Sequence, residues 1–191
     1  MTSKGRRGEN ATTIFHEILQ STLPAIDKTQ FRLTDEAQIV VGGGVETTAF
    51  ALSVGSFHIV NTPRVYAKLH AELVTALPDG DTQIPDLLEL EKLPYLRACI
   101  QESLRLSYGL SARNPRRHPD RPLVYRDWVI PAGTIVAMTI VDVHYDEAIY
   151  PNSHEFRPER WLDDPRAPDG SPLDHYLMAF GRGTRVCLGM K

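Results

Sequence analysis

Residues 180–189, FGRGTRVCLG, place Cys187 in a short segment with three glycines and two arginines. Most free cysteines are small buried hydrophobic residues, and Cys99, which stands among aliphatic residues, fits that interpretation. Around Cys187, backbone N–H groups of a glycine-rich loop and nearby positive charge favour the thiolate form of the side chain. A thiolate is the form of cysteine that binds metals, so the segment predicts a metal ligand at Cys187.

A charged pair precedes this segment. Glu102 and Arg105 are three residues apart on a helix predicted after Pro94, and side chains at that spacing share one helix face. On a solvated surface such a pair contributes only about 0–1 kcal/mol. The rest of this helix is largely apolar, which favours burial, and a buried ion pair needs further partners. Arg160, in the segment 156–161 (FRPERW), is the candidate third member because a guanidinium can serve a carboxylate bidentately.

A third segment, 42–48 (GGGVETT), lies inside a long apolar helix. Three glycines in a helix interior cost about 3 kcal/mol relative to alanine, so they need an explanation. One explanation is close packing of a neighbouring backbone against them. The other is that a flat group lies against the helix, whose hydrogen-bond ladder can widen locally, while Glu46 and Thr47 supply an acid and a hydroxyl for proton transfer.

The remaining pattern is that of a mainly α-helical protein with a small antiparallel β portion. Thr34 is the predicted N-cap of the long helix, and Pro63 opens the next helix. Pro-Asp-Gly at 78–80 is predicted to end that second helix. Residues 123–130 and 134–140, on either side of Pro-Ala-Gly at 131–133, predict a β-hairpin. Beyond residue 150 we expect mostly irregular structure. The predicted helices cover residues 12–20, 35–60, 63–77, 85–92 and 95–107.

Composition narrows the class of protein. The 191 residues are 42% hydrophobic and 24% charged, an ordinary globular balance, and a net charge of −3 gives no general field for nucleic acid or anionic membranes. Two cysteines exclude a disulfide framework, and the polar and charged residues that follow the first basic cluster exclude a secretory signal. The segment 39–60 is long enough to span a membrane, but Glu46 and His58 interrupt it, which favours a buried core helix.

Taken in this order and with this spacing, the segments closely resemble the cytochrome P-450 family, the haem-thiolate monooxygenases. Residues 156–162, FRPERWL, resemble the fungal membrane-bound branch of that family. The resemblance covers essentially the whole chain but only part of the family's fold. The matches are the glycine–acid–threonine pattern at Gly43, Gly44, Glu46, Thr47 and Thr48, the E-x-x-R pair at Glu102 and Arg105, the F-x-P-E-R-[F/W] segment at 156–161, and the cysteine loop at Phe180, Gly183, Arg185, Cys187 and Gly189.

The resemblance implies a fold and a set of roles. Residues 1–191 would form a partial domain, the C-terminal portion of the cytochrome P-450 fold from the oxygen-activating helix through the haem-cysteine loop. Cys187 would be the iron ligand of haem b, and Glu46 and Thr47 the catalytic proton-delivery groups. Glu102, Arg105 and Arg160 would form a structural triad that holds the cysteine loop. The remaining cofactor-binding residues would be Gly43 and Gly44 at an oxygen notch, Arg116 and Arg185 at the haem propionates, and Phe180 and Gly189 in the loop.

The implied reaction inserts one oxygen atom from O₂ into a small organic substrate. Electrons would come from NADPH through a reductase, and no nucleic-acid partner is implied. A complete relative would lie at the endoplasmic reticulum membrane, and we expect the membrane anchor to be absent from this chain. Two alternatives stay open: an inactive truncated fragment of such an enzyme, and a cofactor-free helical packing domain. By itself the 191-residue chain is expected to be inactive.

Overall fold

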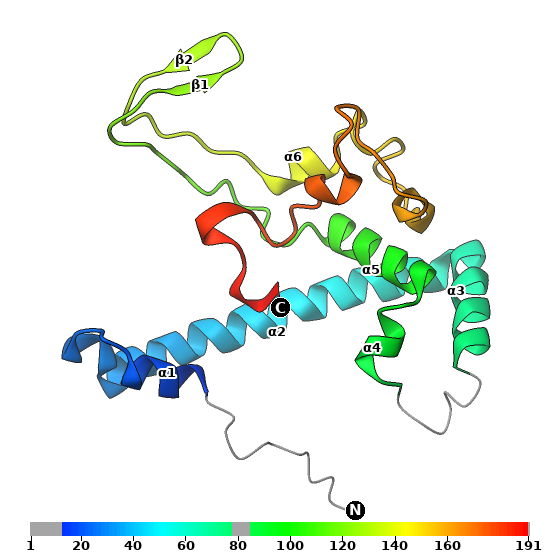
Figure 1. Ribbon diagram of the computed structural model, residues 1–191, viewed down its shortest axis with the longest axis horizontal. Helices are drawn as coiled ribbons and strands as arrows, with labels where there is room; N and C mark the ends of the chain where they lie inside the picture. The colour runs from blue at the N-terminus through cyan, green and yellow to red at the C-terminus, as the bar shows by residue number, and fades with distance from the viewer. Residues whose placement is uncertain (1–12, 78–84, 191) are drawn as a thin grey trace, which may run out of the picture. The chain divides into compact units, whose positions relative to one another are not determined.

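The computed structural model describes residues 13–77 and 85–190, so the predicted break at 78–80 and the first twelve residues lie outside the described part. In the described part the chain is mainly helical with one two-stranded antiparallel sheet, which confirms the expected fold class (Figure 1). Backbone contacts divide the chain into two compact units, Met1–Glu46 and Thr47–Lys191. The long helix α2 (Gln30–Asn61) runs from one unit into the other.

The first unit contains α1 (Ile14–Gln20), the 3-10 helix η1 (Ala25–Lys28) and the start of α2. The prediction of Thr34 as the N-cap of α2 is wrong, because its hydroxyl donates to the carbonyl of Gln30 at 2.9 Å, inside the helix. Thr29 has the capping position instead. It is extended at φ −68° and ψ 152°, and its hydroxyl oxygen accepts the Arg32 N–H at 3.4 Å. Thr29, which directly follows η1, therefore sets the start of the long helix.

Helix α2 continues through Gly42, Gly43 and Gly44 as regular α-helix, with no widened turn at the glycines. Gly55 is its one buried residue among those the structure describes, and large apolar side chains such as Phe57 are exposed. The expectation of a buried core helix is thus not met within the described part of the chain. By length and composition α2 is able to cross a membrane, a property that the core helices of soluble proteins share.

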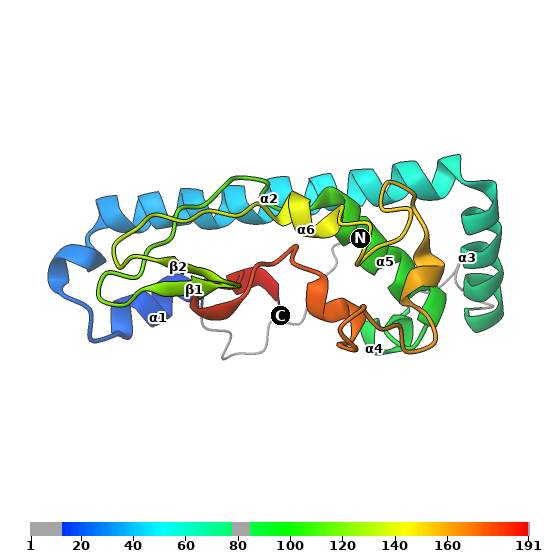
Figure 2. The same cartoon turned by 90° about the horizontal axis from the view of Figure 1, so that it is seen from above.

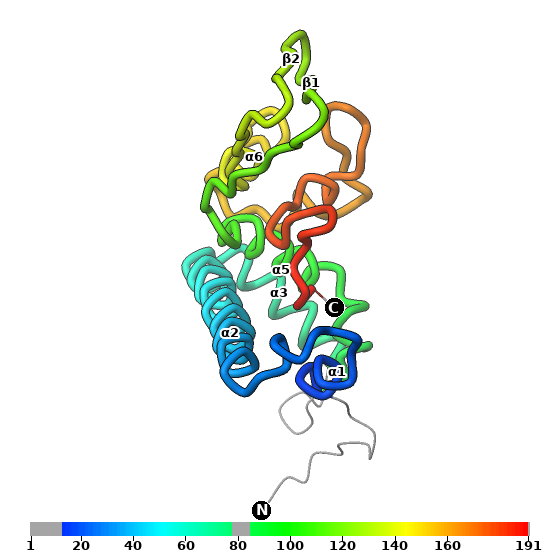
Figure 3. The backbone as a smooth tube through the Cα atoms, turned by 90° about the vertical axis from the view of Figure 1, so that its left-hand side faces the viewer, coloured from blue at the N-terminus to red at the C-terminus, as the bar shows by residue number. Residues whose placement is uncertain are grey.

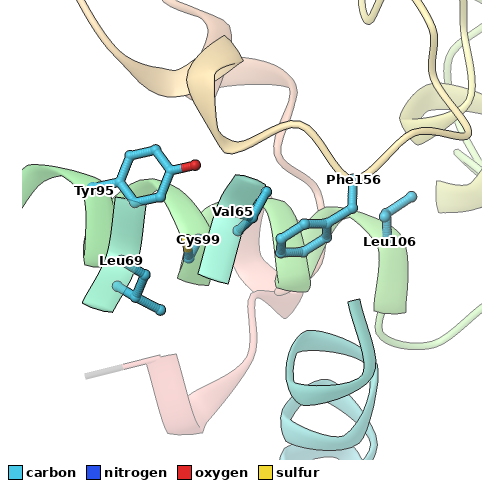
Figure 4. Packing of buried hydrophobic residues seen from close by; sticks show 6 residues of the cluster. All are labelled: Val65, Leu69, Tyr95, Cys99, Leu106 and Phe156. Carbon is cyan, nitrogen blue, oxygen red and sulfur yellow. The ribbon is translucent and has the colours of Figure 1, made fainter. Parts of the chain in front are cut away.

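The core of the second unit lies between α3 (Pro63–Ala76) and α5 (Pro94–Ser107). Asn61-Thr62-Pro63 ends α2, and α3 turns sharply away from it with Pro63 in the first helical turn, as predicted (Figure 2). Val65 and Leu69 of α3 pack against Tyr95, Cys99 and Leu106 of α5 (Figure 4). Phe156 completes this cluster, although it lies far beyond α5 in the sequence.

Two carboxylates join these helices. Glu72 of α3 accepts the backbone N–H groups of Tyr95 and Leu96, both at 2.8 Å, and so satisfies the first turn of α5. Glu159 accepts hydrogen bonds from Lys68 Nζ at 2.8 Å and from the Tyr95 hydroxyl at 3.0 Å, and it also pairs with Arg64. Desolvation alone would raise the pKa of Glu159, but these hydrogen bonds and the Arg64 charge lower it to about 2.

The β-hairpin is shorter than predicted and turns at a different place. Strands β1 (Leu123–Tyr125) and β2 (Trp128–Ile130) pair antiparallel with Tyr125 opposite Trp128, so Arg126 and Asp127 form the turn. Both strands lie within the segment that was expected to form one strand, and the hairpin extends away from α3 and α5 (Figure 3). Residues 134–140 do not form the second strand: Val136 makes one isolated bridge, with Arg116, and α6 (Ile140–His144) follows.

Beyond residue 150 the described chain is irregular apart from short 3-10 helices, as predicted. It is nevertheless packed, because Tyr150, Trp161, Ala167 and Leu173 form a second buried cluster with Ala98 of α5. The short helices are α4 (Leu87–Leu90), η2 (Pro158–Trp161), η3 (Leu173–Tyr176), η4 (Gly183–Arg185) and η5 (Leu188–Met190).

The close crossing of α2 and α5 generates the first prediction. A Cβ atom on Gly55 would lie 2.4 Å from Ser103 Oγ, whose hydroxyl donates to the Cys99 carbonyl at 2.7 Å. Gly55→Val should therefore lower the free energy of unfolding by roughly 1–3 kcal/mol through overpacking. Gly42→Val in the same helix is the matched control, since a Cβ there meets no described atom within 4 Å. Equal unfolding free energies of the two variants in urea would contradict the packing of these helices.

Candidate functional site

A buried ion pair lies on α5. Arg105 Nε donates to Glu102 Oε2 at 2.9 Å, and Arg105 Nη2 donates to Glu102 Oε1 at 2.8 Å. Both side chains are 0% exposed. The two parallel hydrogen bonds form the bidentate arrangement that a planar guanidinium makes with a carboxylate. Such a pair requires that its remaining hydrogen-bonding groups also be satisfied, because both charges have lost water.

The chain satisfies the remaining groups from several segments. Glu102 also accepts from Arg160 Nε at 3.0 Å, Trp161 Nε1 at 2.8 Å and the backbone N–H of Arg157 at 3.0 Å. Arg105 Nη1 donates to the carbonyl of His144 at 2.7 Å. The structure therefore brings the sequence-predicted residues Glu102, Arg105 and Arg160 into direct contact.

His144 belongs to the same network, although the sequence showed no motif that could single it out. It ends α6, it is fully buried, its Nδ1 lies 2.8 Å from the carbonyl oxygen of Arg105, and its Nε2 lies 2.8 Å from the backbone nitrogen of Met178. A carbonyl can only accept and an amide N–H can only donate, so Nδ1 carries the proton and Nε2 accepts. Burial is the main cause that lowers the pKa of His144 to about 4, so the ring is neutral near pH 7.

The cysteine loop begins at Met178. The Gly181 N–H donates to the Met178 carbonyl and the Cys187 N–H donates to the Phe180 carbonyl, both at 2.8 Å. Gly181 and Gly183 adopt φ of 69° and 76°, which residues with a side chain rarely do. These bonds and turns close the loop on itself and leave Cys187 exposed.

The base of the loop also packs against the chain that follows α5. Gly109 has φ 56°, and a Cβ atom there would lie 2.3 Å from the Ala179 carbonyl oxygen. Only glycine allows both the backbone conformation and this approach. The segment that leads into the cysteine loop thus makes two contacts. Ala179 lies against Gly109, which follows α5, and Met178 binds His144 of α6.

The two cysteines differ as the sequence led us to expect. Cys99 is buried in the core of the second unit, where desolvation is the main cause that raises the pKa of its thiol to about 12. Cys187 is exposed, and in the described residues no group of three or more His, Cys, Asp or Glu side chains is placed to hold a metal ion. A haem iron can take a single thiolate ligand from the protein, and the exposed Cys187 side chain is a donor of that kind, so this residue fits haem.

The other predicted site residues lie on separate segments. Gly43, Gly44, Glu46 and Thr47 follow one another on α2 and are exposed. Within the described residues, no hydrogen bond or ion pair connects Arg116 with Arg185 or Cys187 of the cysteine loop. The remaining predicted residues are Arg116, which is bridged to Val136 through its backbone, Arg185, which ends η4, Phe180, which is partly buried, and Gly189, which lies in η5.

The buried pair generates the second prediction. Arg105→Ala should lower the free energy of unfolding by about 3–5 kcal/mol, because it leaves the Glu102 carboxylate buried without its bidentate partner. Arg166→Ala is the control, since Arg166 pairs with Asp164 where the two side chains are 51% and 76% exposed. That variant should lose less than about 1 kcal/mol. Similar losses for the two variants in denaturant titrations would contradict the structural importance of the buried pair.

The third prediction is a pH dependence caused by His144. The ring titrates near pH 6.5 in the unfolded chain and near 4 in the folded protein, so unfolding takes up a proton between these values. The contribution of His144 to the free energy of unfolding should therefore be fully present above pH 6.5. It should fall by about 3 kcal/mol as the pH drops to 4. In His144→Gln, which has no titratable group there, this part of the slope should vanish. Chemical denaturation at a series of pH values checks it, and parallel curves would refute it.

Comparison with known proteins agrees with the arrangement of these segments. The family model for cytochrome P-450 matches residues 21–191. The chain is 47% identical over 182 residues to cytochrome P-450 monooxygenase orf4 of Eupenicillium brefeldianum, covering 94% of this chain and 36% of that protein. It is 48% identical over 179 residues to monooxygenase MO6277 of Ascocoryne sarcoides (93% and 34%), and 46% identical over 184 residues to monooxygenase tpcC of Cochliobolus heterostrophus (93% and 34%).

The chain thus spans about a third of the length of these curated relatives. The residues matched by the family model, 21–191, include the glycine segment of α2, the buried pair of α5 and the cysteine loop. A family model that covers residues 21–191 extends over most of the described structure. The chain therefore belongs to the cytochrome P-450 family.

Proposed function

We propose that this chain is the part of a haem-thiolate monooxygenase that carries the iron-binding cysteine and the oxygen-activating helix. The observation that carries the proposal is the contrast between its two thiols: Cys187 is exposed in a closed glycine-rich loop, whereas Cys99 is buried in the core. The relatives of this chain within the cytochrome P-450 family are named monooxygenases, which supports the same reaction class.

Haem b, when bound, supplies the activation of O₂, and the chain's residues position that chemistry. Cys187 gives its thiolate to the iron, while Phe180 and Gly189 bracket it in the loop. The guanidinium groups of Arg185 and Arg116 are suited to bind the carboxylates of the cofactor.

Residues of α2 supply the remaining functions. Gly43 and Gly44 leave the helix surface without side chains where a flat group approaches. The Thr47 hydroxyl would orient a water molecule and the Glu46 carboxylate would exchange a proton with that water, so the two residues would provide general acid–base assistance. For a complete protein we propose NADPH as the electron source through a reductase, a small organic substrate, and the endoplasmic reticulum membrane as its location.

The fourth prediction tests the ligand. Haemin added to the purified chain should give a thiolate-type absorbance band with carbon monoxide after reduction, in wild type and in Cys99→Ala. Cys187→Ala should lose that band while it keeps the melting temperature, because Cys187 is exposed. We expect haem content below one per chain and no NADPH consumption with a reductase. Persistence of the band in Cys187→Ala would overturn the assignment, and its absence from all three proteins would favour a cofactor-free helical domain.

A further inference from the structure

His144 uses every hydrogen-bonding group of its ring on backbone atoms of two distant segments. Nδ1 donates to the carbonyl of Arg105, and Nε2 accepts the N–H of Met178, both at 2.8 Å. Its own carbonyl accepts Arg105 Nη1 at 2.7 Å. His144 and Arg105 therefore exchange hydrogen bonds in both directions, which fixes the imidazole to the buried charged pair.

The other end of the ring reaches the start of the cysteine loop. Met178 donates to His144 Nε2, and its carbonyl accepts the Gly181 N–H at 2.8 Å. Phe180 in turn accepts the Cys187 N–H at 2.8 Å. A short path of hydrogen bonds and chain thus runs from the Glu102–Arg105 pair, through the imidazole, to the backbone of Cys187.

We propose that His144 is a positioning residue for the cysteine loop, and that the hydrogen bond from the Met178 N–H to Nε2 fixes the base of the loop (178–180) against the Arg105 end of α5. The proposal rests on the proposed function in one respect, that Cys187 is the metal ligand. The two hydrogen bonds of the ring do not depend on haem. The bond to Nε2 holds the start of the loop in place, and the bond from Nδ1 holds the ring in place.

Among the described residues, the two ring nitrogens of His144 make hydrogen bonds only to Arg105 and Met178. The ring is fully buried, lies edge-on to Tyr150 with centroids 6.3 Å apart, and faces the charges of Arg105 and Glu102. The Met178 N–H would lose its acceptor if Nε2 were removed, and a partly buried amide without a partner is costly. Packing alone would instead need only a ring-sized side chain at position 144.

Two amide substitutions separate these explanations. In His144→Gln the side-chain oxygen can reach the place of Nε2 and accept from Met178, whereas in His144→Asn the shorter amide can replace only the Nδ1 donor. His154→Asn is the matched control, since His154 is exposed and stacks on Tyr145 outside this network. All variants are made in the 191-residue chain without haem.

The fifth prediction is a different result for the two amides. Hydrogen exchange of the Met178 amide should be about tenfold faster in His144→Asn than in wild type, with faster alkylation of Cys187 by iodoacetamide in a Cys99→Ala background. His144→Gln and His154→Asn should keep the wild-type rates. Equal rates in the Gln and Asn variants, whether both wild-type or both accelerated, would overturn the proposal, as would protection retained in the Asn variant alone.

Haemin binding then separates this proposal from the proposed function. Thiolate-type haem should be retained in His144→Gln and reduced in His144→Asn. If no protein binds haem through sulfur while the exchange difference between the two amides persists, the proposed function fails and the positioning role stands. If wild type and both amide variants bind haem equally and exchange at equal rates, the positioning role fails and the proposed function stands.

Discussion

The carboxylate of Glu102 has no exposed surface, and the second unit is arranged around the donors that it requires. They come from Arg105 on its own helix and from Arg157, Arg160 and Trp161, more than fifty residues later in the sequence. A carboxylate removed from water destabilises the folded state unless donors replace the water. Because no single segment provides them, the pair can be satisfied only when α5 and η2 lie side by side. The network therefore constrains how α5 and η2 pack against each other.

That arrangement extends to the cysteine loop through backbone atoms. The Arg105 guanidinium binds the carbonyl of His144, and the imidazole of His144 binds the N–H of Met178, so α5, α6 and the start of the loop are joined in sequence. The Ala179 carbonyl also approaches Gly109 so closely that no residue with a side chain would fit at position 109. The loop's base is held from two directions while Cys187 itself stays exposed. This combination suits the metal-ligand role proposed for Cys187, since a ligand atom must be accessible while its backbone is held in place.

The sequence was sufficient to predict the buried pair because both side chains and their spacing were visible in an apolar helix. Arg160 was predicted for the same reason, since a guanidinium is a recognisable partner for a carboxylate. His144 and Gly109 were not predicted, because their partners are a backbone N–H and backbone carbonyls that have no signature in sequence. The hairpin turn was misplaced because Arg126-Asp127 lacks glycine, although Arg126 adopts φ 53°, whereas Pro131 and Gly133 form a separate turn nearby.

Helix α2 illustrates a different limit of sequence reasoning. Its apolar composition predicts burial, but hydrophobic pattern identifies a surface that avoids water and does not identify what covers it. In the second unit Gly55 of α2 lies against Ser103 of α5, where a missing side chain lets two helices approach. A Cβ atom on Gly42, Gly43 or Gly44 would meet no described atom within 4 Å. Within the described residues, close packing therefore explains the glycine at 55 and does not explain the glycines at 42–44, for which a flat group lying against the helix is our proposal.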